Sequence, residues 1–243
     1  MATLADHLTD WIHAEVTVAG GAGAVFGLSG GIDSAVVAAL AKRAFPHHTL
    51  GVIMPCHSDP RDAEDGALVA HHFGVPSATV DLAPVYDVLL GQLAACSSDL
   101  PESRLATANL KPRLRMTTLY AFANQLDYRV LGTGNRAELA VGYFTKYGDG
   151  GVDLLPLGSL VKGEVRDLAR ELGVPEGVVT KPPSAGLWAD QTDESEMGLT
   201  YEELDAYLLT QQASPAVKAR VDAMNAASEH KRVLPRIAPK PGA

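Results

Sequence analysis

The sequence has little of several features that would define other classes of protein. Only two of its 243 residues are cysteines, Cys56 and Cys96, which are too few for a disulfide framework, so we expect two reduced thiols. No apolar stretch reaches the roughly 20 residues that a membrane-spanning helix needs. Residues 1–10 carry acidic side chains and lack the apolar core of a secretion signal. These absences predict a soluble, cytoplasmic protein.

Basic residues are also in short supply. The chain has 20 Lys and Arg against 29 Asp and Glu, a formal net charge of −9. A surplus of negative charge repels nucleic-acid backbones and anionic lipids. The histidine pairs at 47–48 and 71–72 lack metal-ligand spacing with either cysteine. We therefore expect no nucleic-acid partner and no membrane partner.

The length and the 47% hydrophobic content suit one globular domain over residues 1–243. Strand and helix patterns alternate along the first half. We expect strands over 24–28, 49–54, 77–81 and 128–132, with helices over 3–18, 33–44, 62–73, 84–95 and 113–126. This alternation predicts an α/β fold, a doubly wound and mostly parallel sheet with helices on both faces.

The rest of the chain is less regular. Residues 99–108 are polar and are predicted to form a loop, and residues 140–160 are rich in glycine and hold few helical signals. Further helices are expected over 162–172, 200–209 and 215–227. Residues 233–243 contain three prolines and are predicted to be a flexible tail.

The most informative motif joins the first predicted strand to the helix that follows it. It contains two glycines, two hydroxyls and one carboxylate, in the order Ser29-Gly30-Gly31-Ile32-Asp33-Ser34. A strand-to-helix turn of this kind directs free backbone N–H groups and the positive end of the helix dipole at one point, which makes an anion site. Because Asp33 would repel a phosphate, the motif suggests a nucleotide bound with Mg²⁺.

Two other glycine-rich loops do not match. A P-loop requires a lysine directly after its last glycine, and no lysine follows Gly31. The dinucleotide fingerprint requires a third glycine at the position of Phe26, after Gly21 and Gly23. A glycine turn selected only for tightness would explain neither the serines nor the carboxylate.

The Ser-Gly-Gly-x-Asp-Ser string resembles the pyrophosphate-binding loop of ATP pyrophosphatases that adenylate their substrates. Further strings resemble the NAD synthetase family over roughly residues 24–232. They are Lys111-Pro112-Arg113-Leu114-Arg115-Met116, Gly132-Thr133-Gly134-Asn135-Arg136-Ala137-Glu138, the run from Gly142 to Asp153, the run from Lys181 to Trp188, and Glu229-His230-Lys231-Arg232. The resemblance implies the Rossmann-like fold of the ATP pyrophosphatases.

The resemblance also implies a reaction. ATP would adenylate the nicotinate carboxylate of deamido-NAD, and ammonia would then displace AMP to give NAD and pyrophosphate. The adenylation is needed because a free carboxylate would have to expel oxide, whereas AMP is a good leaving group. Charge accumulates on the departing pyrophosphate, which calls for Mg²⁺ and lysine.

Site residues follow from the resemblance, position by position. ATP would be bound by Gly27, Leu28, Ser29, Gly30, Gly31, Ile32, Asp33, Ser34, Thr133, Lys162 and Ser184. Deamido-NAD would be bound by Arg113, Lys146, Asp153, His230 and Lys231. Asp33 and Glu138 would hold Mg²⁺, and Asp33 and Lys162 would serve catalysis.

Each of these roles has a plainer alternative. Glu138 could be an exposed helix carboxylate, and Arg113 with Arg115 a solvated basic face. Lys146 could pack its stem among aromatic neighbours, and His230 and Lys231 could only keep the tail soluble. Lys162 opens a predicted helix, where the dipole disfavours a cation, so a bound anion is the favoured explanation.

The chain has no room for a glutamine-hydrolysing domain, so we expect free ammonia as the nitrogen donor, and a separate glutaminase subunit stays open. A homodimer is expected from the family. One alternative function is another adenylating enzyme of the same fold, such as a GMP synthetase-like or tRNA-modifying enzyme. The other is a nucleotide-binding sensor without catalysis, which would be expected to lose Asp33, Glu138 or the phosphate lysine.

Overall fold

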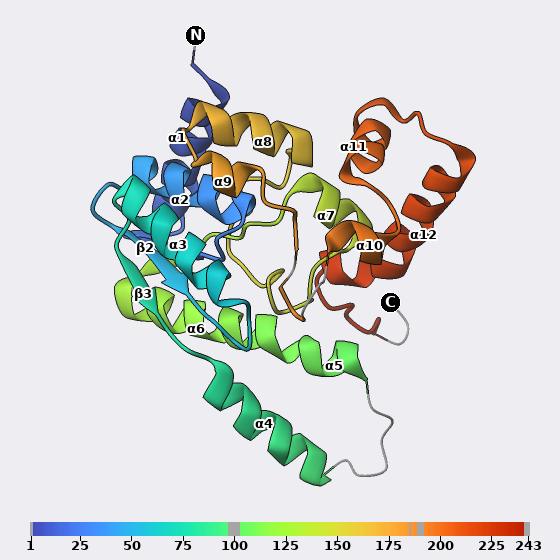
Figure 1. The fold of residues 1–243 in the computed structure, drawn as a ribbon, viewed down its shortest axis with the longest axis horizontal. Coiled ribbons are helices and arrows are strands. Elements are labelled where there is room, and N and C mark those ends of the chain that lie inside the picture. The colour runs from blue at the N-terminus through green and yellow to red at the C-terminus, as the bar shows by residue number, and fades with distance from the viewer. Residues whose placement is uncertain (1, 97–102, 185, 189–191, 241–243) are drawn as a thin grey trace.

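The computed structural model describes residues 2–96, 103–184, 186–188 and 192–240. It contains a parallel sheet in the order β3-β2-β1-β4, with helices packed around it (Figure 1). The strands are β1 (Gly23–Gly27), β2 (Thr49–Ile53), β3 (Ser77–Thr79) and β4 (Tyr128–Val130). The predicted α/β fold with a parallel sheet is therefore confirmed.

The helices connect and cover these strands. They are α1 (Leu4–Val18), α2 (Ile32–Ala44), α3 (Pro60–Phe73), α4 (Ala83–Cys96), α5 (Arg104–Ala108), α6 (Leu110–Leu126), α7 (Arg136–Val141), α8 (Lys162–Glu171), α9 (Glu176–Val179), α10 (Asp193–Met197), α11 (Tyr201–Thr210) and α12 (Pro215–Arg232). No helix in the described part of the chain has the length and apolar character that crossing a membrane requires.

The predicted loop over 99–108 is partly wrong. Residues 104–108 form the short helix α5, which the Ser103 hydroxyl caps by accepting a hydrogen bond of 3.2 Å from the Ala106 amide. Residues 99–102 lie outside the described residues. The helix was missed because a single turn leaves no room for a periodic apolar pattern, and the same holds for α9 and α10.

The sheet separates two apolar layers because side chains alternate along each strand. Ala24 and Phe26 of β1 face a core built with α1, α2, α8 and α9. Val25 faces the opposite side, where α6 covers the sheet and Leu119 and Ala123 supply the apolar surface. Both faces of β1 are therefore buried, as expected for a central parallel strand.

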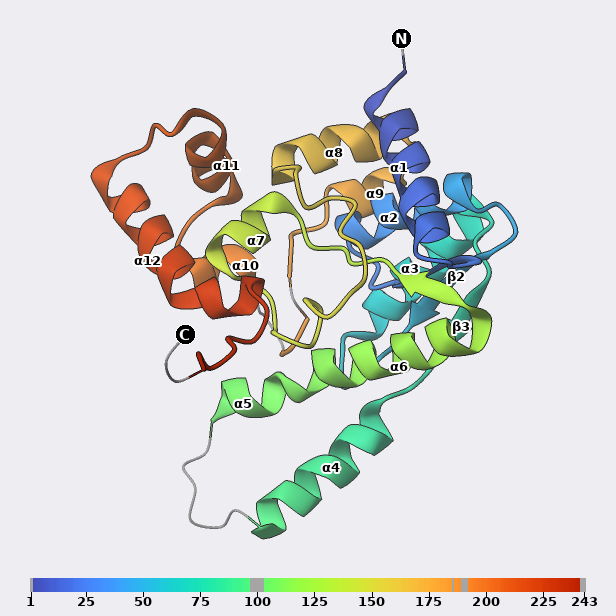
Figure 2. The same ribbon diagram turned by 180° about the vertical axis from the view of Figure 1, so that it is seen from behind.

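A third apolar cluster lies beside the sheet. Figure 2 shows α10, α11 and α12 gathered next to α7. Ala137 and Val141 of α7 pack there with Met197, Tyr201 and Leu204. The C-terminal helices are thereby held against the helix that carries Glu138, which positions them around the carboxyl ends of the strands.

Candidate active site

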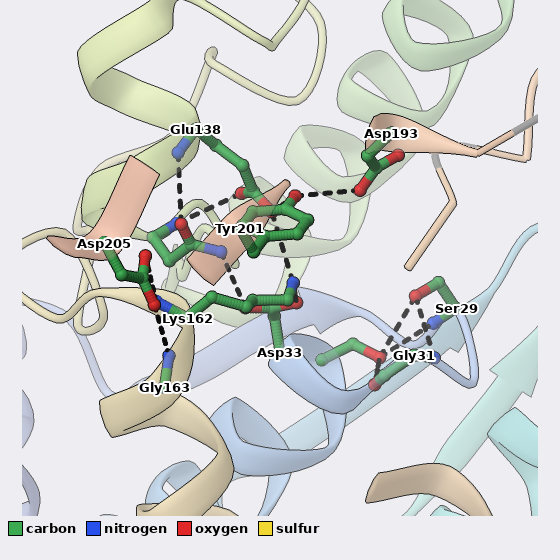
Figure 3. A network of polar contacts seen from close by, with 11 residues as sticks. Ser29, Gly31, Asp33, Glu138, Lys162, Gly163, Asp193, Tyr201 and Asp205 are labelled. Atoms are coloured by element: carbon green, nitrogen blue, oxygen red, sulfur yellow. Dashed lines mark hydrogen bonds and ion pairs between the residues drawn. The ribbon is translucent and has the colours of Figure 1, made fainter. Parts of the chain in front are cut away.

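The Ser29–Ser34 loop joins β1 to α2 at the carboxyl edge of the sheet (Figure 3). The buried Ser34 hydroxyl donates to the Gly31 carbonyl at 2.8 Å and accepts from the Ser29 amide at 3.3 Å. Gly31 caps α2 without a side-chain hydrogen bond, so the first amides of the helix have no side-chain partner at the cap. This is the geometry of an anion site at a helix N-terminus.

Gly30 allows α3 to pack directly against this loop. Its φ of +77° lies in the left-handed region. A Cβ at this position would lie 2.6 Å from the Asp62 carbonyl oxygen and 2.6 Å from the Asp65 Cβ. The close approach leaves no space for a side chain, so α3 forms a wall of the loop.

Asp33, Glu138 and Lys162 come together beside the loop. The Lys162 ammonium lies 2.6 Å from Asp33 Oδ2 and 3.5 Å from Glu138 Oε1, and the Lys162 side chain is only 2% exposed. Burial works against the ammonium, but the two carboxylates outweigh it and raise the pKa of Lys162. Burial also raises the pKa of Glu138 to about 8, opposed by Lys162 and reinforced by Asp33.

Asn135 orients the carboxylates of Asp33 and Glu138, although the sequence did not predict a role for it. Its side-chain amide donates to Asp33 Oδ1 at 3.0 Å. Asn135 also caps α7. Its side-chain Oδ1 accepts from the Glu138 backbone amide at 3.1 Å, and its backbone amide donates to Glu138 Oε2 at 3.1 Å. The Asn-x-x-Glu spacing of a capping box was the signal that could have revealed this contact.

Three residues from the C-terminal half complete the network. The Tyr201 hydroxyl donates to Asp193 Oδ2 at 2.9 Å and lies 3.3 Å from Glu138 Oε1 (Figure 3). Asp205 accepts from the amides of Lys162 and Gly163 at 3.2 and 2.7 Å, so it caps α8 where Lys162 begins it. Sequence reasoning missed all three because no short motif joins them to Glu138 or Lys162 along the chain.

The anionic partners of Lys162 in this structure are protein carboxylates. Its position at the start of α8, which suggested a bound anion, is compensated locally by Asp205 and across the site by Asp33 and Glu138. Contact between Lys162 and ATP stays a prediction.

Thr133 and Ser184 reach this edge on separate segments. Thr133 lies between β4 and α7, two residues before the Asn135 cap. Ser184 is exposed, and its hydroxyl accepts from the Gly186 amide at 3.1 Å. Lys181 ties this segment to α3, with its ammonium 3.0 Å from Asp62 Oδ1 and 2.5 Å from Asp65 Oδ2.

Four of the five residues predicted to bind deamido-NAD form a second group. Arg113 donates to the Lys146 carbonyl at 3.4 Å, and Lys146 donates to the His230 carbonyl. Lys231 donates to the carbonyls of Gly142 and Phe144 at 2.7 and 2.8 Å. A pocket of about 270 Å³ opens beside Lys146 and His230.

Asp153 lies elsewhere in the hydrogen-bond network. Its carboxylate accepts from the Tyr120 hydroxyl at 3.0 Å and from the Val130 amide at 2.8 Å, which holds it beside β4. No hydrogen bond joins it to the second group within the part of the chain that the structure describes. Tyr120, with a pKa raised by burial and by Asp153, was not predicted.

The fold and the site together define a class of protein. A parallel α/β sheet presents a phosphate-type loop at its carboxyl edge, beside two carboxylates that share one buried cation, as in nucleotide-binding enzymes. The chain belongs to the NAD synthase family, whose model matches residues 4–235. This confirms the family resemblance found in the sequence.

Curated relatives support the same assignment. An NH(3)-dependent NAD(+) synthetase from Carboxydothermus hydrogenoformans is 51% identical, and the match covers 96% of this chain and 95% of that protein. One from Syntrophomonas wolfei is 48% identical over 96% of this chain and 94% of its own length.

Solved structures are similar over nearly the whole chain. An NMN synthetase from Francisella tularensis has a TM-score of 0.90 and 36% identity, covering 99% of this chain and 98% of that one. An NAD+ synthetase from Burkholderia pseudomallei has a TM-score of 0.78 and 32% identity, covering 96% and 90%. An NH3-dependent NAD synthetase from Campylobacter jejuni has a TM-score of 0.79 and 28% identity, covering 97% of each chain.

Proposed function

We propose that this chain is a ligase that uses ATP to amidate deamido-NAD with ammonia, through a nicotinate-adenylate intermediate. The observation that carries the proposal is the pair of carboxylates, Asp33 and Glu138, sharing the Lys162 ammonium beside the Ser29–Ser34 loop. The family membership and the curated relatives named as NH(3)-dependent NAD(+) synthetases support the substrates and the donor.

The chemistry divides into two transfers. A nicotinate carboxylate oxygen bonds to the α-phosphorus of ATP, and the bond from that phosphorus to pyrophosphate breaks. Ammonia then adds to the acyl carbon, AMP leaves with its phosphate oxygen, and nitrogen loses one proton. We assign the loop amides of Gly30 and Gly31 and the Ser29 and Ser34 hydroxyls to hold the departing pyrophosphate, because the helix N-terminus favours negative charge there.

Mg²⁺ is the metal that fits this site best. The Asp33 and Glu138 side chains are 16% and 17% exposed, offer hard oxygen ligands and already share one cation. Protein sites hold Mg²⁺ through one or two carboxylates together with substrate phosphates, and Asp33 and Glu138 beside the phosphate loop offer that set of ligands. When bound, Mg²⁺ would neutralise charge on the phosphates.

We propose the remaining site roles as well. Thr133, Ser184 and residues 27–34 would bind ATP, and Arg113, Lys146, Asp153, His230 and Lys231 would bind deamido-NAD. Lys146 and His230 line one pocket, and Arg113 donates a hydrogen bond to the Lys146 carbonyl, which supports the second set. Cys56 and Cys96 are both free thiols, which agrees with the proposed cytoplasmic location.

We also propose a homodimer. Helix α4 projects from the body (Figures 1 and 2), with Val85 and Val88 53% and 68% exposed. These two residues line an apolar hollow together with Pro84, Leu89 and Gln92. Exposed apolar surface of this kind favours burial against a partner, and a second copy is the expected one.

Nicotinate mononucleotide is a second candidate substrate. The observation that favours it is the high structural similarity to the NMN synthetase, with a TM-score of 0.90 against 0.79 and 0.78 for the two NAD synthetase structures. The adenylation and amidation would be the same, and only the adenylate half of the dinucleotide would be absent.

The test is an assay of purified protein with ATP, Mg²⁺ and ammonium chloride. Deamido-NAD and nicotinate mononucleotide are supplied in separate reactions, and kcat/KM is compared. We expect NAD, AMP and pyrophosphate in equal amounts, with deamido-NAD preferred. A higher kcat/KM for nicotinate mononucleotide would make it the substrate in place of deamido-NAD. If neither substrate released pyrophosphate, the proposed function would be refuted. Activity with glutamine in place of ammonium would refute the donor.

A further inference from the structure

Helix α6 carries two cations that the proposed mechanism does not use. Lys111 and Arg115 are one helical turn apart. Lys111 is only 6% exposed, and its ammonium donates to the Leu187 carbonyl at 2.7 Å. Arg115 donates to the Met54 carbonyl and to the Ser58 hydroxyl, both at 3.1 Å. Each of these acceptors is uncharged.

The charge of this pair is unbalanced. Neither residue lies within 4.0 Å of a carboxylate oxygen in the described residues, whereas Lys162 and Lys181 each pair with two carboxylates. Burial lowers the pKa of Lys111, and the Arg115 charge lowers it further. Cys56 partly offsets both charges, and Asp149 and Asp62 offset that of Arg115 from beyond 4.0 Å. A buried charge with no carboxylate at contact distance is costly, so the arrangement calls for an anion.

The pair lies at the edge of the sheet that holds the proposed site. Met54 directly follows β2, so the Arg115 contact marks the carboxyl end of that strand. Leu119, one turn further along α6, lies 3.8 Å from where a Cβ on Gly27 would be, at the entry to the phosphate loop. Leu187, which accepts from Lys111, belongs to the segment that carries Ser184.

We propose that Lys111 and Arg115 form an anion subsite for a phosphate group of a bound nucleotide, separate from the Ser29–Ser34 loop. A guanidinium offers five donors in a planar fork that matches phosphate oxygens, and the Arg115 hydrogen bonds to Met54 and Ser58 use two of its three nitrogens. The identity of the ligand as a nucleotide substrate rests on the proposed function. ATP and deamido-NAD both carry such phosphates, and the experiment separates them.

The experiment measures binding by calorimetry, with ATP alone, deamido-NAD alone and the phosphate-free probe adenosine. Wild type is compared with Lys111→Met, Arg115→Lys and Arg115→Met, and with Arg170→Met as a control at an exposed cation. We expect Lys111→Met to weaken the binding of one of the two nucleotides by about tenfold or more, because charge-assisted hydrogen bonds are lost. The nucleotide that weakens identifies the source of the phosphate.

Adenosine should bind wild type and Lys111→Met equally, since it has no phosphate. The ligand-free Lys111→Met protein should unfold at the same temperature as wild type or higher, because an unpaired buried charge has been removed. A role in packing alone predicts the reverse, a lower unfolding temperature and equal weakening of adenosine and ATP.

Unchanged affinity of Lys111→Met for both nucleotides would overturn the proposal, and so would weakening of adenosine to the same extent as ATP. If Arg115→Met does not fold, Lys111→Met and Arg115→Lys still decide the question. Binding requires no turnover. A wild-type protein that binds nucleotide but makes no amide would therefore refute the proposed function and leave the subsite proposal standing.

Discussion

At the scale of single residues, Gly30 shows how one atom constrains the phosphate loop. An alanine there would combine a left-handed φ of +77° with a Cβ 2.6 Å from the Asp62 carbonyl oxygen. We expect Gly30→Ala to lower the free energy of unfolding by about 2–4 kcal/mol and to weaken ATP binding. Urea unfolding with circular dichroism measures the first effect, and calorimetry the second.

Gly31→Ala is the matched control for stability. Gly31 has a φ of −87°, and a Cβ there would meet only the Ser29 hydroxyl oxygen at 3.5 Å, an ordinary contact. Its stability should therefore stay close to that of wild type. If the two alanine variants were equally destabilised, the close approach of α3 to Gly30 would not be the cause.

Glu138 gives the ligand-free protein a dependence on pH. Burial raises its folded-state pKa to about 8 from 4.5, so the folded state binds a proton more tightly than the unfolded state does. That contribution is fully present below the unfolded pKa and is lost as pH rises toward 8. Since one pKa unit is about 1.4 kcal/mol, the loss is on the order of a few kcal/mol.

Chemical unfolding at pH 5 and pH 8, in the presence of a chelator, measures this loss. The Glu138→Gln variant cannot titrate, so its stability should change less between the two pH values than that of wild type. Parallel curves for the two proteins would assign the dependence to other groups.

At the scale of elements, ion pairs join α3 to residues 181–184. Lys181 bridges Asp62 and Asp65 on the helix that walls the phosphate loop, and Ser184 follows three residues later. The pairing therefore relates the position of Ser184 to that of the loop. We expect Lys181→Met to raise KM for ATP several-fold with a smaller change in kcat, because about 1 kcal/mol of positioning is lost.

Steady-state kinetics at saturating deamido-NAD provide the measurement. Lys181→Arg should restore KM because it keeps the charge. Arg43→Met, which removes an exposed ion pair with Asp6, serves as the control. An unchanged KM for ATP in Lys181→Met would show that the ion pairs do not position the segment.

At the scale of the whole molecule, the exposed apolar face of α4 governs the predicted association. Val88→Glu places a charge on that face, and a dimer formed there would have to bury it. Sedimentation velocity should show wild-type dimers and Val88→Glu monomers at micromolar concentration. Val18→Glu, at a still more exposed valine on α1, should stay dimeric. A dimer that survives Val88→Glu would place the interface elsewhere.

The whole structure also shows how much of the fold could be predicted from the sequence. Each predicted strand exists, because short runs bounded by turn residues carry a local signal. The one-turn helix α5 was missed, and α12 extends to Arg232 beyond its predicted end. Helix ends and single turns depend on capping contacts such as that of Ser103, and periodicity does not register them.

The sequence by itself determined the anion loop, the alternation of strands and helices and the family, because each is written in contiguous residues. Only the tertiary structure decided which distant groups meet. Lys162 and Asp33 are 129 positions apart, and Tyr201, Asp193 and Asp205 come from helices with no shared motif. It also decided that Lys111 is buried, although a lysine near a helix start is normally solvated. Such contacts depend on how parallel crossovers bring strand ends to one edge and how helices pack there, and no local pattern encodes that packing.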